Sequence, residues 1–91
     1  MTLDELYKTI ISRKVELPEG SYVASLFKGS DDRIIQKVGE EATEVVIAAK
    51  NSSKERLISE TADLLFHILV LLAARGVNLE EVMNELESRK N

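Results

Sequence analysis

The sequence has no cysteine and only one proline, and each of these shortages excludes a class of structure or chemistry. Without cysteine there is no disulfide, no thiol nucleophile and no thiolate metal ligand. A single proline, four glycines and the lack of any low-complexity run argue against a disordered chain. No segment shows sustained alternation of β-branched and polar residues, so no strand is predicted. We therefore expect a folded domain made of helices.

Positive charge is also scarce. The 91 residues include 12 Lys and Arg against 16 Asp and Glu, which gives a formal net charge of −4. Because nucleic-acid backbones attract basic surfaces, we expect no nucleic-acid partner. The longest apolar run, residues 64–74, falls short of the ~20 residues that cross a bilayer, and the first residues do not form a secretory signal. We expect a cytoplasmic protein with no membrane partner.

The whole chain, residues 1–91, is predicted to be a single all-α domain. Capping residues and apolar spacing predict helices over about residues 3–14, 21–28, 31–50, 53–75 and 79–89. Ser52 and Glu55 have the spacing of a capping box that opens the fourth helix, and Asn78 with Glu81 opens the fifth. In that last helix, four apolar residues are expected to face inward: Leu79, Val82, Met83 and Leu86.

Residues 64–74 are apolar on every side of the predicted fourth helix, apart from His67. A helix of this kind is normally buried all round. One small chain cannot surround it, whereas a second copy can. The predicted fold class is therefore a small helical bundle of four to five helices, completed by homodimerisation with this helix near the interface.

Two acidic pairs form the chief functional pattern. Glu41 and Glu44 lie three residues apart, as do Glu60 and Asp63, so each pair shares one helix face. Either pair alone is typical of a solvated surface. The tight turn at residues 51–53 forces the two helices to pack antiparallel, which places both pairs on facing sides of one hairpin. Four clustered carboxylates require a cation. Glu40 lies farther toward solvent and would support the site.

The ligands are all oxygen atoms, which suits Mg²⁺, Mn²⁺ or Ca²⁺. A di-iron site is excluded because it needs a Glu-x-x-His motif on two helices and the chain has one histidine. Mg²⁺ often recruits substrate phosphates, so the pattern indicates phosphate chemistry. Basic residues are the second requirement for a phosphate substrate, and Lys37 is the best placed because it shares a helix side with Glu41 and Glu44. The other candidates are Lys50, Lys28, Arg13, Lys14 and Arg75, and any one of these taken singly is typical of a solubilising surface residue. His67 either hydrogen-bonds the Asp63 carboxylate or is a core histidine satisfied by a backbone carbonyl.

The acids at 40, 41, 44, 60 and 63, spaced E-E-x-x-E and E-x-x-D, resemble the signature of the all-α NTP pyrophosphatases, the MazG-like superfamily. The longer strings at residues 21–27, 37–50 and 62–67 closely resemble the phosphoribosyl-ATP pyrophosphatase family. The similarity covers roughly residues 3–86. Two positions depart from that family's pattern: Val23 stands where Thr is expected and Phe66 where Tyr is expected.

The resemblance implies Mg²⁺-dependent hydrolysis of phosphoribosyl-ATP to phosphoribosyl-AMP and pyrophosphate, the second step of histidine biosynthesis. It implies a cytoplasmic helical dimer, with the phosphoribosyl-AMP cyclohydrolase that acts next as a candidate partner. Mg²⁺ would be held by Glu41, Glu44, Glu60 and Asp63. Water positioned by Glu41 or Glu44 would attack the α-phosphorus.

Two other functions stay open at this point. One is a different MazG-like nucleotide pyrophosphatase, acting on dUTP, dCTP or a damaged nucleotide. The other is a helical dimerisation module with acidic faces and no catalysis, which should bind Mg²⁺ no better than any acidic surface.

Overall fold

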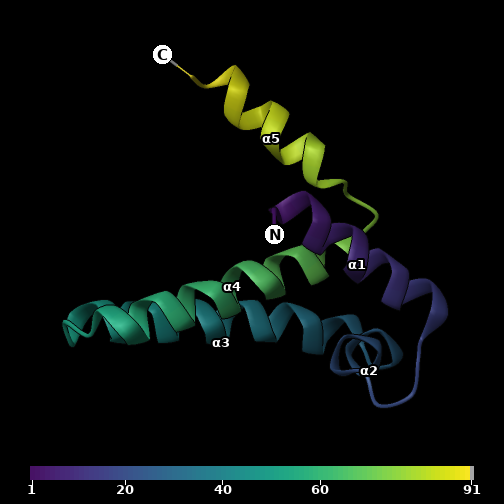
Figure 1. The fold of residues 1–91 in the computed structure, drawn as a ribbon, viewed down its shortest axis with the longest axis horizontal. Coiled ribbons are helices and arrows are strands. Elements are labelled where there is room, and N and C mark those ends of the chain that lie inside the picture. Colours follow the sequence, from purple (N-terminus) through teal and green to yellow (C-terminus); the bar gives the residue numbers. More distant parts are fainter. Residues whose placement is uncertain (91) are drawn as a thin grey trace.

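The computed structural model describes residues 1–90, which form five α-helices and no strand, as the sequence predicts (Figure 1). Each helix ends within about two residues of its predicted bounds. The helices are α1 Leu3–Glu16, α2 Tyr22–Lys28, α3 Asp31–Lys50, α4 Lys54–Ala74 and α5 Leu79–Ser88.

The long helices α3 and α4 pack side by side as an antiparallel hairpin (Figure 1). Asn51 ends α3, and the chain then turns through Ser52, which has a left-handed φ of 57°. Ser53 caps α4, because its side chain accepts a hydrogen bond from the Arg56 N–H at 3.2 Å. The predicted capping box of Ser52 and Glu55 is therefore wrong, since the left-handed turn at Ser52 moves the cap one residue along.

The core lies where α1 and α2 cover the C-terminal half of α4. Ile10, Leu26 and Val70 come from these three helices and are almost completely buried. Two side chains of α1 also hold the end of α4 in place. The Lys14 Nζ donates to the Ala73 carbonyl at 2.7 Å, and the Tyr7 hydroxyl donates to the Val77 carbonyl at 2.6 Å.

The end of α4 sets the direction of α5. Gly76 has a left-handed φ of 70°, and the Val77 N–H donates to the Leu72 carbonyl at 2.9 Å. This is the bonding of a Schellman motif, which stops a helix and turns the chain. The α5 helix then extends away from the other helices (Figure 1). Leu79, its first residue, is partly buried against the core as predicted. The predicted inward packing of the other three apolar residues is wrong within one chain, because Val82, Met83 and Leu86 are 36%, 50% and 54% exposed.

The apolar half of α4 is only partly covered by its own chain. Leu69, Val70 and Ala73 are buried, whereas Leu65 is 40% exposed. Among residues 1–90, α4 is the one helix long and apolar enough, by length and composition, to cross a membrane. It nevertheless carries the acids Glu60 and Asp63 and packs along α3 and α1, so it is the core helix of this fold.

Candidate functional site

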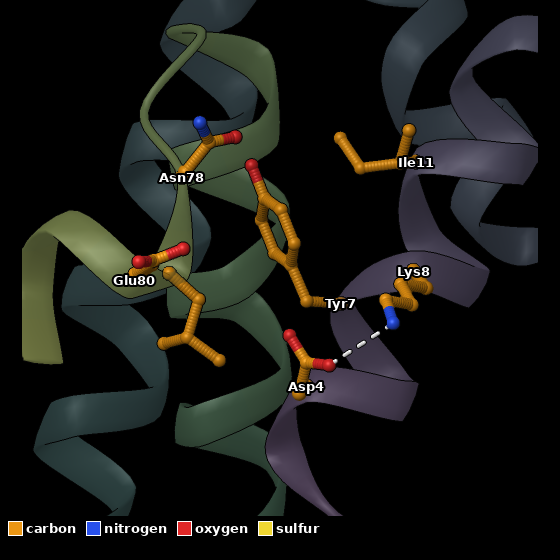
Figure 2. Close-up of a pocket in the computed structure, with 7 residues that line it drawn as sticks. Asp4, Tyr7, Lys8, Ile11, Asn78 and Glu80 are labelled. Atoms are coloured by element: carbon orange, nitrogen blue, oxygen red, sulfur yellow. Dashed lines mark ion pairs between the residues drawn. The ribbon is translucent and has the colours of Figure 1, made fainter.

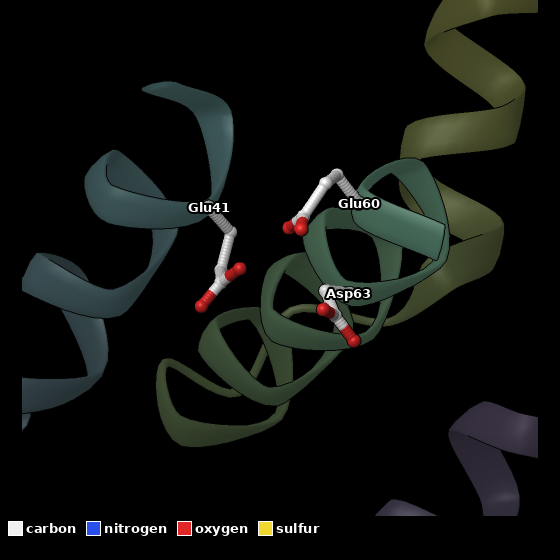
Figure 3. Close-up of side chains that lie close together, drawn as sticks. All are labelled: Glu41, Glu60 and Asp63. Atoms are coloured by element: carbon white, nitrogen blue, oxygen red, sulfur yellow. The ribbon is translucent and has the colours of Figure 1, made fainter. Parts of the chain in front are cut away.

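The α3–α4 hairpin brings three of the four predicted metal acids together. Glu41 on α3 and Glu60 and Asp63 on α4 each offer one carboxylate oxygen, and these three oxygens lie within 4.8 Å of one another (Figure 3). Glu60 and Asp63 are one turn apart on the same face, and the antiparallel packing sets Glu41 opposite them. Glu41 and Glu60 are partly buried, while Asp63 is exposed and leaves the cluster open to solvent.

Lys37 lies one helical turn before Glu41 and contacts the edge of this cluster. Its Nζ is 3.3 Å from Glu41 Oε1 and 3.6 Å from Glu40 Oε1. Partial burial opposes the charged form, but the hydrogen bond to Glu41 and the charges around it raise the pKa of Lys37 overall. The site therefore keeps a fixed ammonium group beside its acids at neutral pH, as the sequence predicts for a phosphate ligand.

Glu44 contacts a partner that the sequence did not reveal. Arg56 Nη2 lies 3.6 Å from Glu44 Oε2 and 3.5 Å from Glu60 Oε1, so one guanidinium bridges the two helices. The spacing of Arg56 and Glu60, four residues apart on one helix, was a signal available in the sequence. In this arrangement Glu44 does not join the three-acid cluster.

The remaining charged candidates lie outside the cluster. Glu40 accepts a hydrogen bond from Gln36 Nε2 at 2.9 Å, and this bond, assisted by Lys37, lowers the pKa of Glu40. Lys28 and Lys50 are exposed at the C-terminal ends of α2 and α3, and neither forms an ion pair within residues 1–90. Their contact with phosphate stays a prediction.

His67 is buried one turn beyond Asp63. Its Nδ1 lies 2.8 Å from the Asp63 backbone carbonyl rather than from the carboxylate, so the second of the two predicted roles holds. A carbonyl oxygen only accepts, so Nδ1 carries the proton. In the neutral form of the ring Nε2 is then an acceptor, and the Tyr22 hydroxyl, 3.0 Å away, donates to it.

The donor set is suited to a hard divalent cation. Every ligand atom is a carboxylate oxygen, and hard cations such as Mg²⁺ prefer oxygen ligands while retaining open positions for water or phosphate. Glu41, Glu60 and Asp63 can hold such an ion, because their oxygens converge from two helices and one side of the cluster is exposed.

A separate hollow lies elsewhere, between α1 and the start of α5 (Figure 2). It measures about 290 Å³ and is lined by Tyr7, Ile11 and Leu79 together with polar residues. Its one basic group, Lys8, is 3.3 Å from Asp4 and is neutralised by it. The hollow offers neither clustered acids nor free positive charge, so we place the functional site at the hairpin.

Comparison with known proteins identifies the family of the chain. The sequence model of the family described as phosphoribosyl-ATP pyrophosphohydrolase matches residues 3–90. The chain belongs to the phosphoribosyl-ATP pyrophosphohydrolase family. It is 58% identical over 87 residues to the phosphoribosyl-ATP pyrophosphatase of Trichlorobacter lovleyi, covering 96% of this chain and 81% of that protein. The corresponding enzyme of Metallosphaera sedula is 53% identical, with 96% and 94% covered.

Another relative in this family has two activities. The histidine biosynthesis bifunctional protein HisIE of Caldanaerobacter subterraneus is 49% identical over 87 residues, which are 96% of this chain and 42% of that protein. The resemblance predicted from the acidic motif and the longer strings is therefore confirmed at the family level. The departures at Val23 and Phe66 do not remove the chain from the family.

Proposed function

We propose that this chain hydrolyses phosphoribosyl-ATP to phosphoribosyl-AMP and pyrophosphate in histidine biosynthesis, with Mg²⁺ held by the acids of the α3–α4 hairpin. The observation that carries the proposal is the convergence of Glu41, Glu60 and Asp63 in a chain that the family model matches from residue 3 to residue 90. The same match favours this substrate over those of other MazG-like enzymes. It also argues against a non-catalytic dimerisation module.

The acids of the hairpin have separate roles in this proposal, namely metal binding and activation of water. Glu41, Glu60 and Asp63 would hold Mg²⁺, Glu44 would join them from the neighbouring turn of α3 on leaving Arg56, and Glu40 would support the site from outside. When bound, Mg²⁺ supplies positive charge to the phosphate oxygens and acidifies water. Glu44 is 45% exposed and Glu41 13% exposed at their side chains, so both can approach a solvent-derived nucleophile from the open side.

The reaction itself is a displacement at phosphorus. A water oriented by the carboxylate of Glu41 or Glu44 gives up a proton to that carboxylate as its oxygen bonds to the α-phosphorus. The bond from the α-phosphorus to the bridging oxygen breaks, and pyrophosphate leaves with that oxygen. The charged Lys37 ammonium stabilises the negative charge that builds up on the phosphates. Lys28 and Lys50 would contact the outer phosphates.

The setting of the enzyme is also part of the proposal. The uncovered apolar residues of the hairpin and of α5 support a homodimer, in which a second copy covers them. We place the protein in the cytoplasm, where its nucleotide substrate is made. The bifunctional relative supports the phosphoribosyl-AMP cyclohydrolase as the partner that takes the product.

The test is an assay of pyrophosphate release from phosphoribosyl-ATP by the purified chain, with and without Mg²⁺. Wild type should turn over only with the metal. Asp63→Asn and Glu60→Gln keep side-chain size while removing one charge each from the cluster, and each should lower kcat at least about a hundredfold, as loss of a charge-stabilising group does. Helix content, followed by circular dichroism, should stay unchanged.

Glu55→Gln is the matched control. Glu55 is an exposed acid in the first turn of α4 with no ion pair within residues 1–90, so its loss should leave turnover within about twofold of wild type. Near-normal turnover in both cluster variants would contradict the assignment of the acids. A wild type that released pyrophosphate from dUTP or dCTP but not from phosphoribosyl-ATP would contradict the substrate.

A further inference from the structure

Tyr22 is an aromatic residue with an exposed ring near the α3–α4 hairpin, because its hydroxyl contacts His67 of α4. The chain has four aromatic residues. Tyr7 lies in the core, and Phe27 and Phe66 are partly buried against it. Tyr22, at the first position of α2, is 48% exposed. Among residues 1–90 it is therefore the one aromatic residue with an exposed side chain.

The exposed ring is held firmly rather than left to rotate. Its hydroxyl donates to His67 Nε2 at 3.0 Å, and His67 is itself fixed by the bond from Nδ1 to the Asp63 carbonyl. The Tyr22 ring also stacks on Phe66, with ring centroids 6.2 Å apart and planes 25° apart. A ring anchored at its hydroxyl and stacked on one side keeps its remaining surface in a fixed position.

That surface lies next to the proposed reaction site. His67 is one turn along α4 from Asp63, which is about 5.4 Å of helix rise. Across the hairpin, Lys37 is one turn along α3 from Glu41, in the same direction away from the acids. Tyr22 reaches this end of the cluster through its hydrogen bond to His67. The ring therefore stands on the side of the acidic cluster toward which both His67 and Lys37 lie.

We propose that the ring of Tyr22, backed by Phe66 and fixed by His67, stacks on the adenine base of the nucleotide whose phosphates meet the acidic cluster. This inference rests on the proposed function and adds the base-binding surface to it. Every nucleobase has a π-face that an aromatic side chain can cover, and such stacking needs no hydrogen-bond partners at the base edge. In this arrangement His67 is a positioning residue that acts through Tyr22.

The deciding experiment compares a ligand with a base and a ligand without one. Calorimetry in Mg²⁺ measures the affinity of wild type and of Tyr22→Ala for two ligands. One is the α,β-methylene analogue of phosphoribosyl-ATP, in which the oxygen between the α- and β-phosphorus is replaced and hydrolysis is blocked, and the other is inorganic tripolyphosphate. We expect Tyr22→Ala to weaken nucleotide binding about tenfold to a hundredfold, the range that loss of one stacked base gives. Tripolyphosphate affinity should stay within about twofold. In turnover assays the same variant should raise KM more than it lowers kcat.

Two further variants test the anchoring. Tyr22→Phe keeps the ring and removes the hydroxyl that His67 binds, so it should raise KM by less than Tyr22→Ala does. Tyr7→Phe is the matched control, because it also removes one tyrosine hydroxyl but lies in α1, and its KM should equal that of wild type. His67→Gln should raise KM toward the value of Tyr22→Phe. Because His67 is buried, its substitution also disturbs the core, and Tyr22→Phe therefore tests the same hydrogen bond from the exposed side.

Equal nucleotide affinity in wild type and Tyr22→Ala would overturn the inference, and so would an equal loss of tripolyphosphate affinity. A change in the mass of the assembly without a change in nucleotide affinity would also overturn it, by assigning the ring to a contact between copies of the chain. None of these measurements depends on catalysis, so each is valid whether or not wild type releases pyrophosphate. Absence of that release would count against the proposed function alone.

Discussion

Tyr7 ties the first helix to the loop that follows α4, and it does so with a side chain that is almost fully buried. Its hydroxyl donates to the Val77 carbonyl at 2.6 Å. Burial raises the pKa of Tyr7, and the nearby negative charge of Glu81 raises it further. The folded protein therefore holds the phenol proton more tightly than the unfolded chain does.

This shift has a definite sign for stability. The stabilisation of the fold by the Tyr7 proton is complete below the pKa of 10.0 in the unfolded chain. It is lost as the pH rises through the higher pKa of the folded protein. We expect Tyr7→Phe to lower the free energy of unfolding by about 1 kcal/mol at neutral pH, through the lost hydrogen bond. The variant should also lose less stability than wild type when the pH is raised above about 10. Urea unfolding at the two pH values measures both effects, and parallel losses in the two proteins would contradict the prediction.

Arg56 is the residue that sequence reasoning missed, and its position explains why Glu44 departs from the cluster. The predicted four-acid arrangement treated each carboxylate by its place on a helix wheel. A long side chain from the facing helix can reach across the groove, and Arg56 does so to contact both Glu44 and Glu60. Helix geometry fixes where side chains start, whereas their ends depend on neighbours that only the packed structure supplies.

The bridge formed by Arg56 should compete with a bound cation for the same carboxylates. The contacts are half-exposed, so Arg56→Gln should lower the free energy of unfolding without Mg²⁺ by less than about 1 kcal/mol. Mg²⁺ affinity should rise several-fold, because the acids lose a positive neighbour. Calorimetric titration with Mg²⁺ measures this. Arg75→Gln is the control, since it removes an exposed charge at the far end of α4, and weaker Mg²⁺ binding by Arg56→Gln would contradict the competition.

At the scale of elements, the hairpin was the most predictable part of the fold. The bounds of α3 follow from the cap at Ser30, the acids after it and the stop at Asn51, and the structure has the predicted helix there. The turn was harder, because Ser52 and Ser53 are both good capping residues. Their roles are decided by which serine takes the left-handed backbone conformation, and local sequence does not determine that.

The turn provides a direct test of this correction. Ser53→Ala removes the side chain that accepts from the Arg56 N–H, and should lower the free energy of unfolding by about 1 kcal/mol. Ser52→Ala is the matched control, because it also removes one hydroxyl group and Ser52 contributes no capping bond. Ser and Ala both carry a Cβ, so the substitution does not change the strain of the left-handed backbone there. Thermal or urea unfolding of the two variants compares them. A larger loss of unfolding free energy from Ser52→Ala would mean that Ser52 caps α4, as the predicted capping box had it.

The fifth helix shows where sequence reasoning could not succeed. Its apolar spacing predicts a buried face, and the pattern does not say whether that face is covered by the same chain or by another. The Schellman motif at Gly76 aims α5 away from the core, so one chain leaves the face open. The family resemblance and the acidic site were recoverable from sequence because they depend on local spacing, whereas this contact depends on assembly.

At the scale of the whole molecule, one chain is less compact than its length allows. The radius of gyration is 14.2 Å, whereas a compact domain of this length has a value of about 12 Å. Several apolar side chains of the hairpin also remain exposed, and these are Val46, Ile47, Leu57, Ile58 and Leu65. Both features are expected of a subunit that completes its core by associating with a second copy.

Ile58 tests that association, because it is 61% exposed on the outer surface of the hairpin. Ile58→Lys should convert the proposed dimer to a monomer, since a buried unpaired ammonium opposes association. Light scattering coupled to size exclusion gives the mass. Val15→Lys is the control: Val15 is 77% exposed on α1, and its variant should keep the dimer mass. A wild type with the mass of one chain would contradict the dimer.

The confinement of the acids to one hairpin affects how this enzyme can be combined with others. The proposed metal ligands and Lys37 all lie in one uninterrupted stretch of polypeptide, residues 37–63. A second catalytic unit could therefore be joined at either end of the chain without interrupting the site. A gene fusion that links two successive reactions would then need only a connecting segment, with no rebuilding of the metal ligands. This chain matches 42% of the length of the bifunctional relative, which leaves room in that protein for a second catalytic unit.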